Sequence, residues 1–525
     1  MRCSADATYL LYLFHHIFKL TKKHFFMLDY SKKLMSSSTF AFMGFVLAAI
    51  FSYLTRIILA RNLSVEDVGL FFSVLNLIIF VTLFQKIGIE MALVRYVNVW
   101  KEQGRFDKIK QIFVHTFWFQ VIIGLFYAAI LYLVSDTVTQ FYFHNMSAKI
   151  LLLFLTPLLL LLVFEDLPRR VFQGFNNMIW FSLLEAGKAL LLLLFITIGF
   201  FSGPTILVPV FAYLGATFVI SIIAIIGIFR YYPFFKEKGA KEKGLFREVF
   251  LFGIHLIFFV IGNKVVESLD LLILTYYAPL EQVGIYSIVL PTAALGLFVY
   301  RTLAVVVLPL ASELWERNDV VQLTQLLRLI HRYLYLLMVP LIILFYCYAE
   351  FVLSFLFGPT YADGATALRI IIIGSFFFGL CLINISLLTA IGSSKKAGII
   401  MLYSAGINVL FNFLLIPYYG MVGASIATLI SYLLAFIISL IFVKKEITKK
   451  DSNFSFYLPK LRFYIALGSF LVLLILLNKI LPQTSIITIL STIIISFVSY
   501  IILINRLNLY TLKEIKEVWH SIRKK

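Results

Sequence analysis

The chain has 525 residues, of which 62% are apolar and 17% aromatic while only 14% are charged, and its mean hydropathy is +0.98. Ordinary soluble domains are about 45–50% apolar, so this composition excludes a soluble globular protein and predicts an all-α polytopic membrane protein. The formal net charge of +19 lies in short Lys/Arg clusters between long apolar runs, a pattern that argues against nucleic-acid binding.

The first 35 residues are expected to form a cytoplasmic N-terminal segment, 1–35. Their apolar stretch, YLLYLFHHIFKL, is too short to span a bilayer and lacks the small-residue cleavage site of a signal peptide. Two interpretations of residues 1–26 stay open: an interfacial helix, or translated sequence upstream of a start at Met27 or Met35.

Runs of about 20 apolar residues mark helices that can cross a bilayer. The sequence predicts fourteen of them, in the windows 38–60, 69–93, 111–134, 149–166, 177–201, 205–229, 250–275, 284–309, 329–356, 366–391, 397–417, 421–443, 461–481 and 484–505. With this alternation, 36 of the 45 Lys and Arg residues share one side with both termini, and three lie opposite. Because positive loops stay inside, both termini are predicted to be cytoplasmic.

Two similar phrases point to an internal duplication. EDVGLF at 66–71 and EQVGIY at 281–286 follow the first and seventh predicted spans and are 215 residues apart. Six spans per repeat give both halves the same topology, as in transporters whose halves are related by an axis along the membrane normal. We expect an N-lobe (36–235, spans 1–6), a cytoplasmic linker (236–248), a C-lobe (249–445, spans 7–12), a second linker with spans 13–14 (446–505) and a basic cytoplasmic tail (506–525).

Five phrases carry a resemblance to a known family. RIILARNLSVEDVGLFF, KIGIEMALVRYVNVW, SLDLLILTYYAPLEQVGIYSIV, FGPTYADGATALRIIIIG and NVLFNFLLIPYYGMVGASIATLISY occur in this order between about Ser36 and Lys445. They resemble the polysaccharide (O-antigen-type) flippases of the MOP superfamily, which also contains MATE drug exporters and peptidoglycan-precursor flippases. The resemblance implies two six-helix lobes, alternating access and export of polyisoprenoid-pyrophosphate-linked sugars. Many members have twelve spans, so spans 13 and 14 are either a lipid or oligomer contact or a groove for a lipid tail.

Six basic residues fall within predicted spans and are candidate substrate ligands: Arg56, Lys86, Lys188, Lys264, Arg301 and Arg369. Cations lining a hydrated cavity between the lobes would balance a pyrophosphate charge, and Arg can bind phosphate oxygens bidentately. Structural roles are the alternative for several of them.

Local spacing supports those structural roles. Lys86 and Glu90 are four residues apart, and Glu185 and Lys188 are three apart, so each pair can form on one helix face. Arg56 and Arg369 lie near span ends, where long side chains reach toward the interface. Arg301 has no acidic residue within a turn.

The seventh span contains Lys264, Glu267 and Asp270 at three-residue spacing. Lys264 and Glu267 can pair along one helix edge, which leaves Asp270 nearer the external end. A carboxylate inside the membrane is a candidate for coupling to Na⁺ or a proton, and an interlobe salt bridge is the equal alternative. Glu90 and Glu185 are further candidates for coupling or gating.

Three amides within predicted spans, Asn384, Asn408 and Asn412, are expected to hydrogen-bond between helices rather than to bind sugar. The cysteines lack metal-ligand spacing, so no metal site or cofactor is expected beyond a coupling ion. No Ser-His-Asp, Walker or paired-carboxylate pattern occurs, which argues against an enzyme.

The sequence therefore predicts a non-enzymatic, multi-pass flippase of the cell membrane that moves lipid-linked oligosaccharide to the external leaflet. Its expected partners are that substrate, membrane lipids and other glycan-assembly proteins, and no nucleic acid. One alternative is a MATE-type exporter of organic cations, which would need an acidic cavity. The other is a membrane polymerase or glycosyltransferase, which would need a larger external domain.

Overall fold

The computed structural model describes residues 29–232, 242–452, 454–457, 459–480, 486–507 and 509, without the side chains of 29–41, 255–267 and 486. These residues form helices and short connections with no strand, and the prediction of an all-α membrane protein is confirmed. The segment 1–26, much of the linker 236–248 and the tail from residue 510 lie outside the described residues.

Twelve helices in the described ranges are long and apolar enough to cross a membrane. Helix α17 (Ser394–Ile447) covers two predicted windows, and its backbone leaves helical geometry between them at Gly420 (φ 51°, ψ −130°). Helix α11 (Leu245–Tyr277) covers the window 250–275, but only Ser268–Tyr277 contributes a described apolar stretch. Fourteen crossings and cytoplasmic termini stay predictions.

The chain divides into two compact units. Unit 1 takes residues up to Asn62, Val81–Ser135 and Leu151–Ile257, and unit 2 takes Leu63–Phe80, Asp136–Ile150 and the chain from Phe258. The predicted lobe boundaries, 36–235 and 249–445, stay a prediction. The division into units places 63–80 and 136–150 with unit 2.

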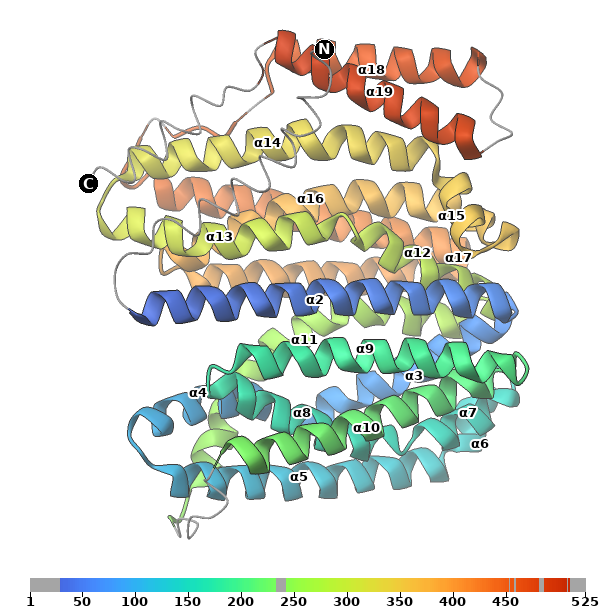
Figure 1. Cartoon of the computed structure of the whole chain (residues 1–525), viewed down its shortest axis with the longest axis vertical. Helices are drawn as coiled ribbons and strands as arrows, with labels where there is room; N and C mark the ends of the chain where they lie inside the picture. The colour runs from blue at the N-terminus through green and yellow to red at the C-terminus, as the bar shows by residue number, and fades with distance from the viewer. Residues whose placement is uncertain are drawn as a thin grey trace. The chain divides into compact units, whose positions relative to one another are not determined.

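Unit 1 is a layered helix bundle in which α2 packs on α9, and α10 packs on α8 and α9 (Figure 1). Small residues allow the close approach of α2 and α9, as is common between membrane helices, because a Cβ atom on Gly44 would lie 2.6 Å from Ser182 Cβ. The helices are α2 (Asp29–Asn62), α4 (Ile89–Glu102), α5 (Phe106–Leu133), α8 (Leu158–Gly174), α9 (Met178–Phe201) and α10 (Leu207–Tyr231), with parts of α3 (Val65–Lys86), α7 (Ser147–Leu155) and α11.

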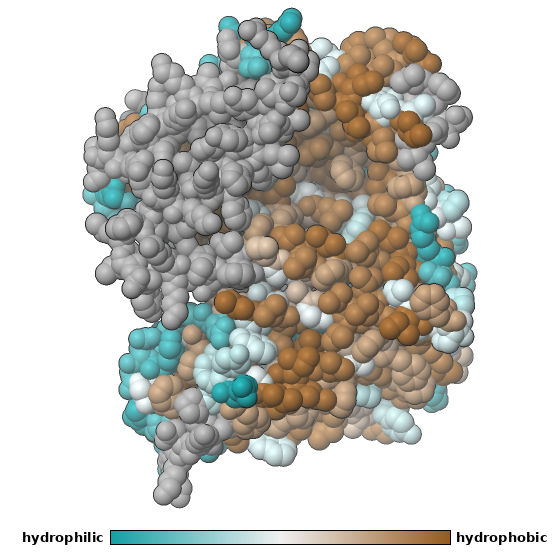
Figure 2. Space-filling view, viewed as in Figure 1, coloured by the Kyte–Doolittle hydropathy of each residue, from teal (hydrophilic) through white to brown (hydrophobic). Residues whose placement is uncertain are grey.

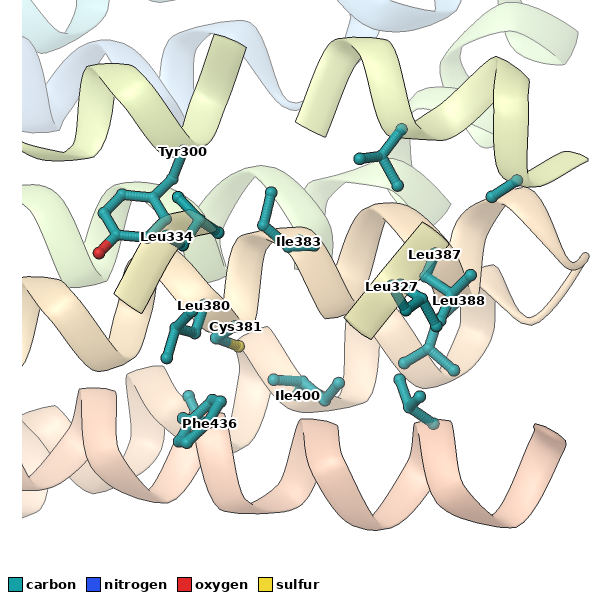
Figure 3. Close-up of a cluster of buried hydrophobic side chains, with 14 of the residues drawn as sticks. Tyr300, Leu327, Leu334, Leu380, Cys381, Ile383, Leu387, Leu388, Ile400 and Phe436 are labelled. Carbon is teal, nitrogen blue, oxygen red and sulfur yellow. The ribbon is translucent and has the colours of Figure 1, made fainter. Parts of the chain in front are cut away.

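Unit 2 is organised around α16, which packs against α12, α13, α14 and α17. Its core brings together Tyr300, Leu334 and Phe436 (Figure 3), and Phe378 stacks on Tyr432 with 4.2 Å between ring centroids. The elements are α12 (Leu280–Ala294), α13 (Leu297–Glu316), α14 (Val320–Cys347), α15 (Ala349–Phe357), η2 (Pro359–Gly364), α16 (Ala365–Ala390), α17, α18 (Leu461–Ile480) and α19 (Ile486–Arg506), with α6 (Ser135–Phe141) and the start of α3.

The two repeated phrases cross each other within unit 2. A Cβ atom on Gly69 of α3 would lie 2.1 Å from the Leu280 carbonyl oxygen, and one on Gly284 of α12 would lie 2.1 Å from the Val65 carbonyl oxygen. Leu280 follows Val65, and Gly284 follows Gly69, by the same 215 positions that separate the phrases. The contact is therefore reciprocal, as expected of two equivalent helices that meet at a pseudo-two-fold axis.

The last two helices dock on α14. Tyr500 Oη donates a hydrogen bond to the Leu336 carbonyl at 3.0 Å, and Tyr348 Oη donates to Asn478 Oδ1 at 2.6 Å. These bonds and a shared apolar cluster make α18 and α19 part of unit 2.

Apolar side chains cover much of the surface that Figure 2 shows, and hydrophilic side chains gather toward helix ends. Large exposed residues such as Trp118, Ile122 and Val305 are 57%, 61% and 71% accessible. Such surfaces suit hydrocarbon, in which helices satisfy their own backbone hydrogen bonds.

Candidate functional site

A network of charges in unit 1 centres on Asp166 of α8. Lys86 Nζ, at the end of α3, donates to Asp166 Oδ2, and Arg169 Nη2 donates to Asp166 Oδ1 at 2.7 Å. Lys86 Nζ also lies 3.4 Å from Glu90 Oε1 on α4. The Asp166–Lys86 ion pair thus connects α8 to α3, and the Lys86–Glu90 ion pair connects α3 to α4.

Further ion pairs extend the network to α9. Arg169 pairs with Glu185, and Lys188 Nζ donates to Glu165 Oε2 at 2.6 Å. Arg170 Nε lies 3.4 Å from Glu90 Oε2. The network holds four cations and four carboxylates, namely Lys86, Arg169, Arg170 and Lys188 with Glu90, Glu165, Asp166 and Glu185.

Three of the four carboxylates are more deeply buried than the cations, and the exception is Glu185, which is 39% exposed. The side chains of Glu90, Glu165 and Asp166 are 3–8% exposed, whereas the four cations keep 15–25% of their surface. The three buried carboxylates pair with these cations and fix their positions. The four basic side chains keep part of their surface accessible, and charge-assisted bonds to phosphate oxygens are among the strongest that Lys and Arg form.

The network differs from the local pairing suggested by spacing. The Lys86–Glu90 pair is present, but Lys188 and Glu185 each bind a partner on α8 instead of each other. Sequence reasoning missed Glu165 and Asp166 at the end of the predicted span, and it missed the roles of Arg169 and Arg170 because it ended the span at 166. Helix α8 continues through Pro168 to Gly174. The sequence does contain a signal for this network, because two adjacent acidic residues, Glu165 and Asp166, stand at the end of an apolar run.

We expect Lys188→Met to destabilise the protein by about 3 kcal/mol, since it leaves the Glu165 carboxylate buried without its cation. Adding Glu165→Gln should recover most of that loss. A double-mutant cycle on thermal unfolding in detergent measures both effects. Equal stability of Lys188→Met and the wild type would contradict the pairing.

A second polar cluster lies buried in unit 2 around Asp270 of α11. Asp270 is fully buried and accepts hydrogen bonds from Asn412 Nδ2, from Thr428 Oγ1 at 2.6 Å and from Tyr286 Oη at 3.1 Å. Asn412 also donates to Asn408 Oδ1 at 3.1 Å. No basic side chain pairs with Asp270 in the part of the chain whose side chains the structure describes. The carboxyl group is held by neutral donors from α12 and both halves of α17.

The oxygen atoms of this cluster could bind a proton or a small hard cation. Asn412 Oδ1 is buried without a hydrogen-bond donor among the described groups, and the carboxylate, hydroxyl and amide oxygens beside it are ligands that hard cations prefer. No group of three His, Cys, Asp or Glu residues that could hold a metal ion occurs in the described part of the chain. One carboxylate with neutral oxygens suits a monovalent ion.

Sequence reasoning identified Asp270, Asn408 and Asn412, and the structure brings these three residues together. It missed Thr428 and Tyr286, which are neutral residues in apolar runs and give no distinct pattern. Asn384 lies apart, where its Nδ2 donates to Ser439 Oγ at 2.8 Å between α16 and α17, a packing contact.

The remaining predicted cations lie on other helices than Lys86 and Lys188. Arg56 is half-buried on α2 of unit 1. In unit 2, Arg369 donates to Glu350 at 3.0 Å and to the Tyr346 carbonyl at 3.1 Å, whereas Arg301 is exposed on α13 and no described side chain pairs with it. The Lys264 and Glu267 side chains lie outside the described residues.

Apolar helices of bilayer length that hold ionised and hydrogen-bonded groups in their interior are typical of a polytopic membrane transporter. A family model described as polysaccharide biosynthesis protein matches residues 34–315, and one described as lipid II flippase MurJ matches residues 192–503. The chain belongs to the polysaccharide biosynthesis protein family, among the flippases of the MOP superfamily.

Solved structures share the fold. Lipid II flippase MurJ in an inward closed conformation matches with a TM-score of 0.70 and 14% identity, over 88% of this chain and 97% of that one. An inward-facing multidrug resistance MATE family transporter matches with a TM-score of 0.65 and 16% identity, over 78% and 96%. In sequence, an uncharacterized membrane protein of Methanocaldococcus jannaschii is 26% identical over 512 residues, which cover 95% of this chain and 100% of that protein.

Proposed function

We propose that the protein translocates a polyisoprenoid-(pyro)phosphate-linked oligosaccharide from the cytoplasmic to the external leaflet of the cell membrane by alternating access. Family membership supports the class of activity. The observation that carries the substrate class is the unit 1 network, in which four partly accessible cations pair with carboxylates of which three are buried.

The chemistry of the network suits an anionic head group. Arg carries five N–H donors and Lys three, so Arg169 and Lys188 can bind phosphate oxygens while they keep their carboxylates. The four positive and four negative charges of the network sum to zero. Without substrate, the network therefore places no net charge in the low-dielectric interior of the membrane. A phosphate would then meet the partly accessible cations, while three of the four carboxylates are buried and Glu185 alone is exposed.

The four cations weigh against a MATE-type exporter of organic cations, because a cationic drug would have to approach basic side chains whose carboxylate partners are mostly buried. An enzyme that polymerises glycans is not favoured by any described feature. Transport coupled to Na⁺ or protons at the Asp270 cluster is part of the proposal, since this buried carboxyl group has no cation partner among described side chains.

Deleting the gene in its native host tests the function. We expect loss of a surface glycan and accumulation of its lipid-linked precursor in the cytoplasmic leaflet, both reversed by the wild-type gene. Unchanged surface glycan with new sensitivity to organic cations would instead establish the exporter.

Arg301 provides a separate test in unit 2. We expect Arg301→Ala to lower glycan export at least about tenfold, a loss of roughly 1.4 kcal/mol in substrate stabilisation. Stability should change by less than about 0.5 kcal/mol, because Arg301 is exposed and breaks no described ion pair. Export assays and thermal unfolding measure the two effects. Arg317→Ala is the control, since it removes an exposed Arg at the C-terminus of α13 and breaks only an exposed ion pair with Glu313. Full export by Arg301→Ala would remove this residue from the substrate path.

A further inference from the structure

A pocket of about 520 Å³ opens at the surface of unit 1, where the first turns of α5 lie beside the start of α11 (Figure 1). Gln111 fixes the segment before α11: its Nε2 donates to the Glu242 carbonyl at 2.9 Å, and its Oε1 accepts from the Glu242 amide at 3.3 Å. His115, Lys243, Phe246 and Arg247 complete the lining. The pocket lies at the end of unit 1 that is predicted to be cytoplasmic.

The pocket carries positive charge that nearby acids do not neutralise. The Glu242 carboxylate lies 2.7 Å from Lys108 Nζ, and Glu248 accepts a hydrogen bond from Tyr96 Oη at 2.9 Å. Lys243 and Arg247 are both exposed, and neither pairs with a side chain that the structure describes. A negatively charged group would therefore find two available cations here.

Exposed apolar side chains continue from the pocket along both helices. On α5, Trp118, Ile122 and Leu125 follow His115 on the same face and are 57%, 61% and 52% exposed. On α11, Leu251 lies one turn beyond Arg247 and is 46% exposed. Leu125 lies ten positions beyond His115, about 15 Å along the helix, which is half of a hydrocarbon core of about 30 Å and so one leaflet.

We propose that this surface binds one anionic phospholipid of the cytoplasmic leaflet, with its phosphate between Lys243 and Arg247 and its acyl chains along α5. A free phosphate would use only the charged end and would leave the apolar stripe without a role. The bound lipid would hold the start of α11 against α5 within unit 1. This site is independent of the proposed substrate.

Native mass spectrometry of the full chain in detergent tests the site, with phosphatidylglycerol, phosphatidylcholine and inorganic phosphate as probes. We expect Lys243→Gln/Arg247→Gln to weaken phosphatidylglycerol binding about 25-fold, and each single variant about fivefold, because every basic residue near an anionic lipid contributes comparably. The control Lys444→Gln/Lys445→Gln removes two exposed charges from the end of α17 and should stay within about twofold of wild type.

A second variant tests the apolar part. Ile122→Ser keeps both cations, and we expect it to weaken phosphatidylglycerol binding severalfold. Size-exclusion profiles that match wild type show that the variants fold. Equal phosphatidylglycerol affinity in the Lys243/Arg247 and Lys444/Lys445 double variants would overturn the site. Displacement of the lipid by inorganic phosphate at equal concentration would overturn the assignment to a lipid.

Discussion

Asp270→Asn is expected to abolish the ion dependence of transport and to lower its rate at least about a hundredfold. Asparagine cannot take up a proton or offer a charged ligand to Na⁺, and its amide donors would face the donors of Asn412 and Thr428. Each buried donor left without an acceptor costs about 1–3 kcal/mol, so a fall in thermal stability should accompany the loss. Transport in proteoliposomes under imposed Na⁺ and pH gradients measures the effect.

Asn384→Ala is the matched control for Asp270→Asn. It removes a buried amide of α16 whose hydrogen bond goes to Ser439 on α17 and not to a member of the Asp270 cluster. We expect this variant to lose some stability and to keep its response to the ion gradient. If transport by Asp270→Asn responds to the ion gradients as wild type does, the Asp270 cluster has only a structural role.

Gly284→Ala and Gly69→Ala are expected to have the second large effect. In each case the new Cβ atom would lie 2.1 Å from a backbone carbonyl oxygen, a position that no rotamer change can relieve. The two helices must move apart, and overpacking of this kind costs typically about 1–3 kcal/mol. Since the crossing joins the repeated phrases, we expect transport to fall at least about tenfold. Thermal unfolding and transport of the purified variants measure both quantities.

Gly406→Ala is the control for the crossing. Gly406 also lies in a helix of unit 2, but no atom lies within 4 Å of the position that its Cβ would take. Alanine favours helix over glycine by about 1 kcal/mol, so this variant should be as stable as wild type or more so. If Gly284→Ala and Gly406→Ala have similar thermal stability and transport, the close contact between α3 and α12 is not required for either.

Much of the fold could be predicted from the sequence. Apolar runs of bilayer length identify the helices because a membrane demands continuous hydrophobicity. The phrases at Glu66 and Glu281 marked the helices that cross at Gly69 and Gly284, since a close crossing requires glycine at the same place in each copy. The break in α17 falls at the Gly420 of the phrase PYYGMVG.

The partners within the candidate sites could not be predicted, because helix rotation and not sequence spacing decides them. Lys188 and Glu185 are three residues apart, yet they bind Glu165 and Arg169 on α8. Thr428 was missed for a related reason: hydroxyl residues are common between membrane helices, and only the position of Asp270 distinguishes this one.

The central claim is that the partly accessible cations of unit 1, paired with mostly buried carboxylates, bind an anionic, lipid-linked saccharide. The most direct measurement is translocation of a labelled polyisoprenyl-pyrophosphate oligosaccharide in proteoliposomes that contain the purified chain. We predict translocation well above that of protein-free vesicles, at least tenfold slower with Arg169→Gln, and no transport of an organic cation. Translocation no faster than in protein-free vesicles, or uptake of the organic cation in its place, would contradict the account.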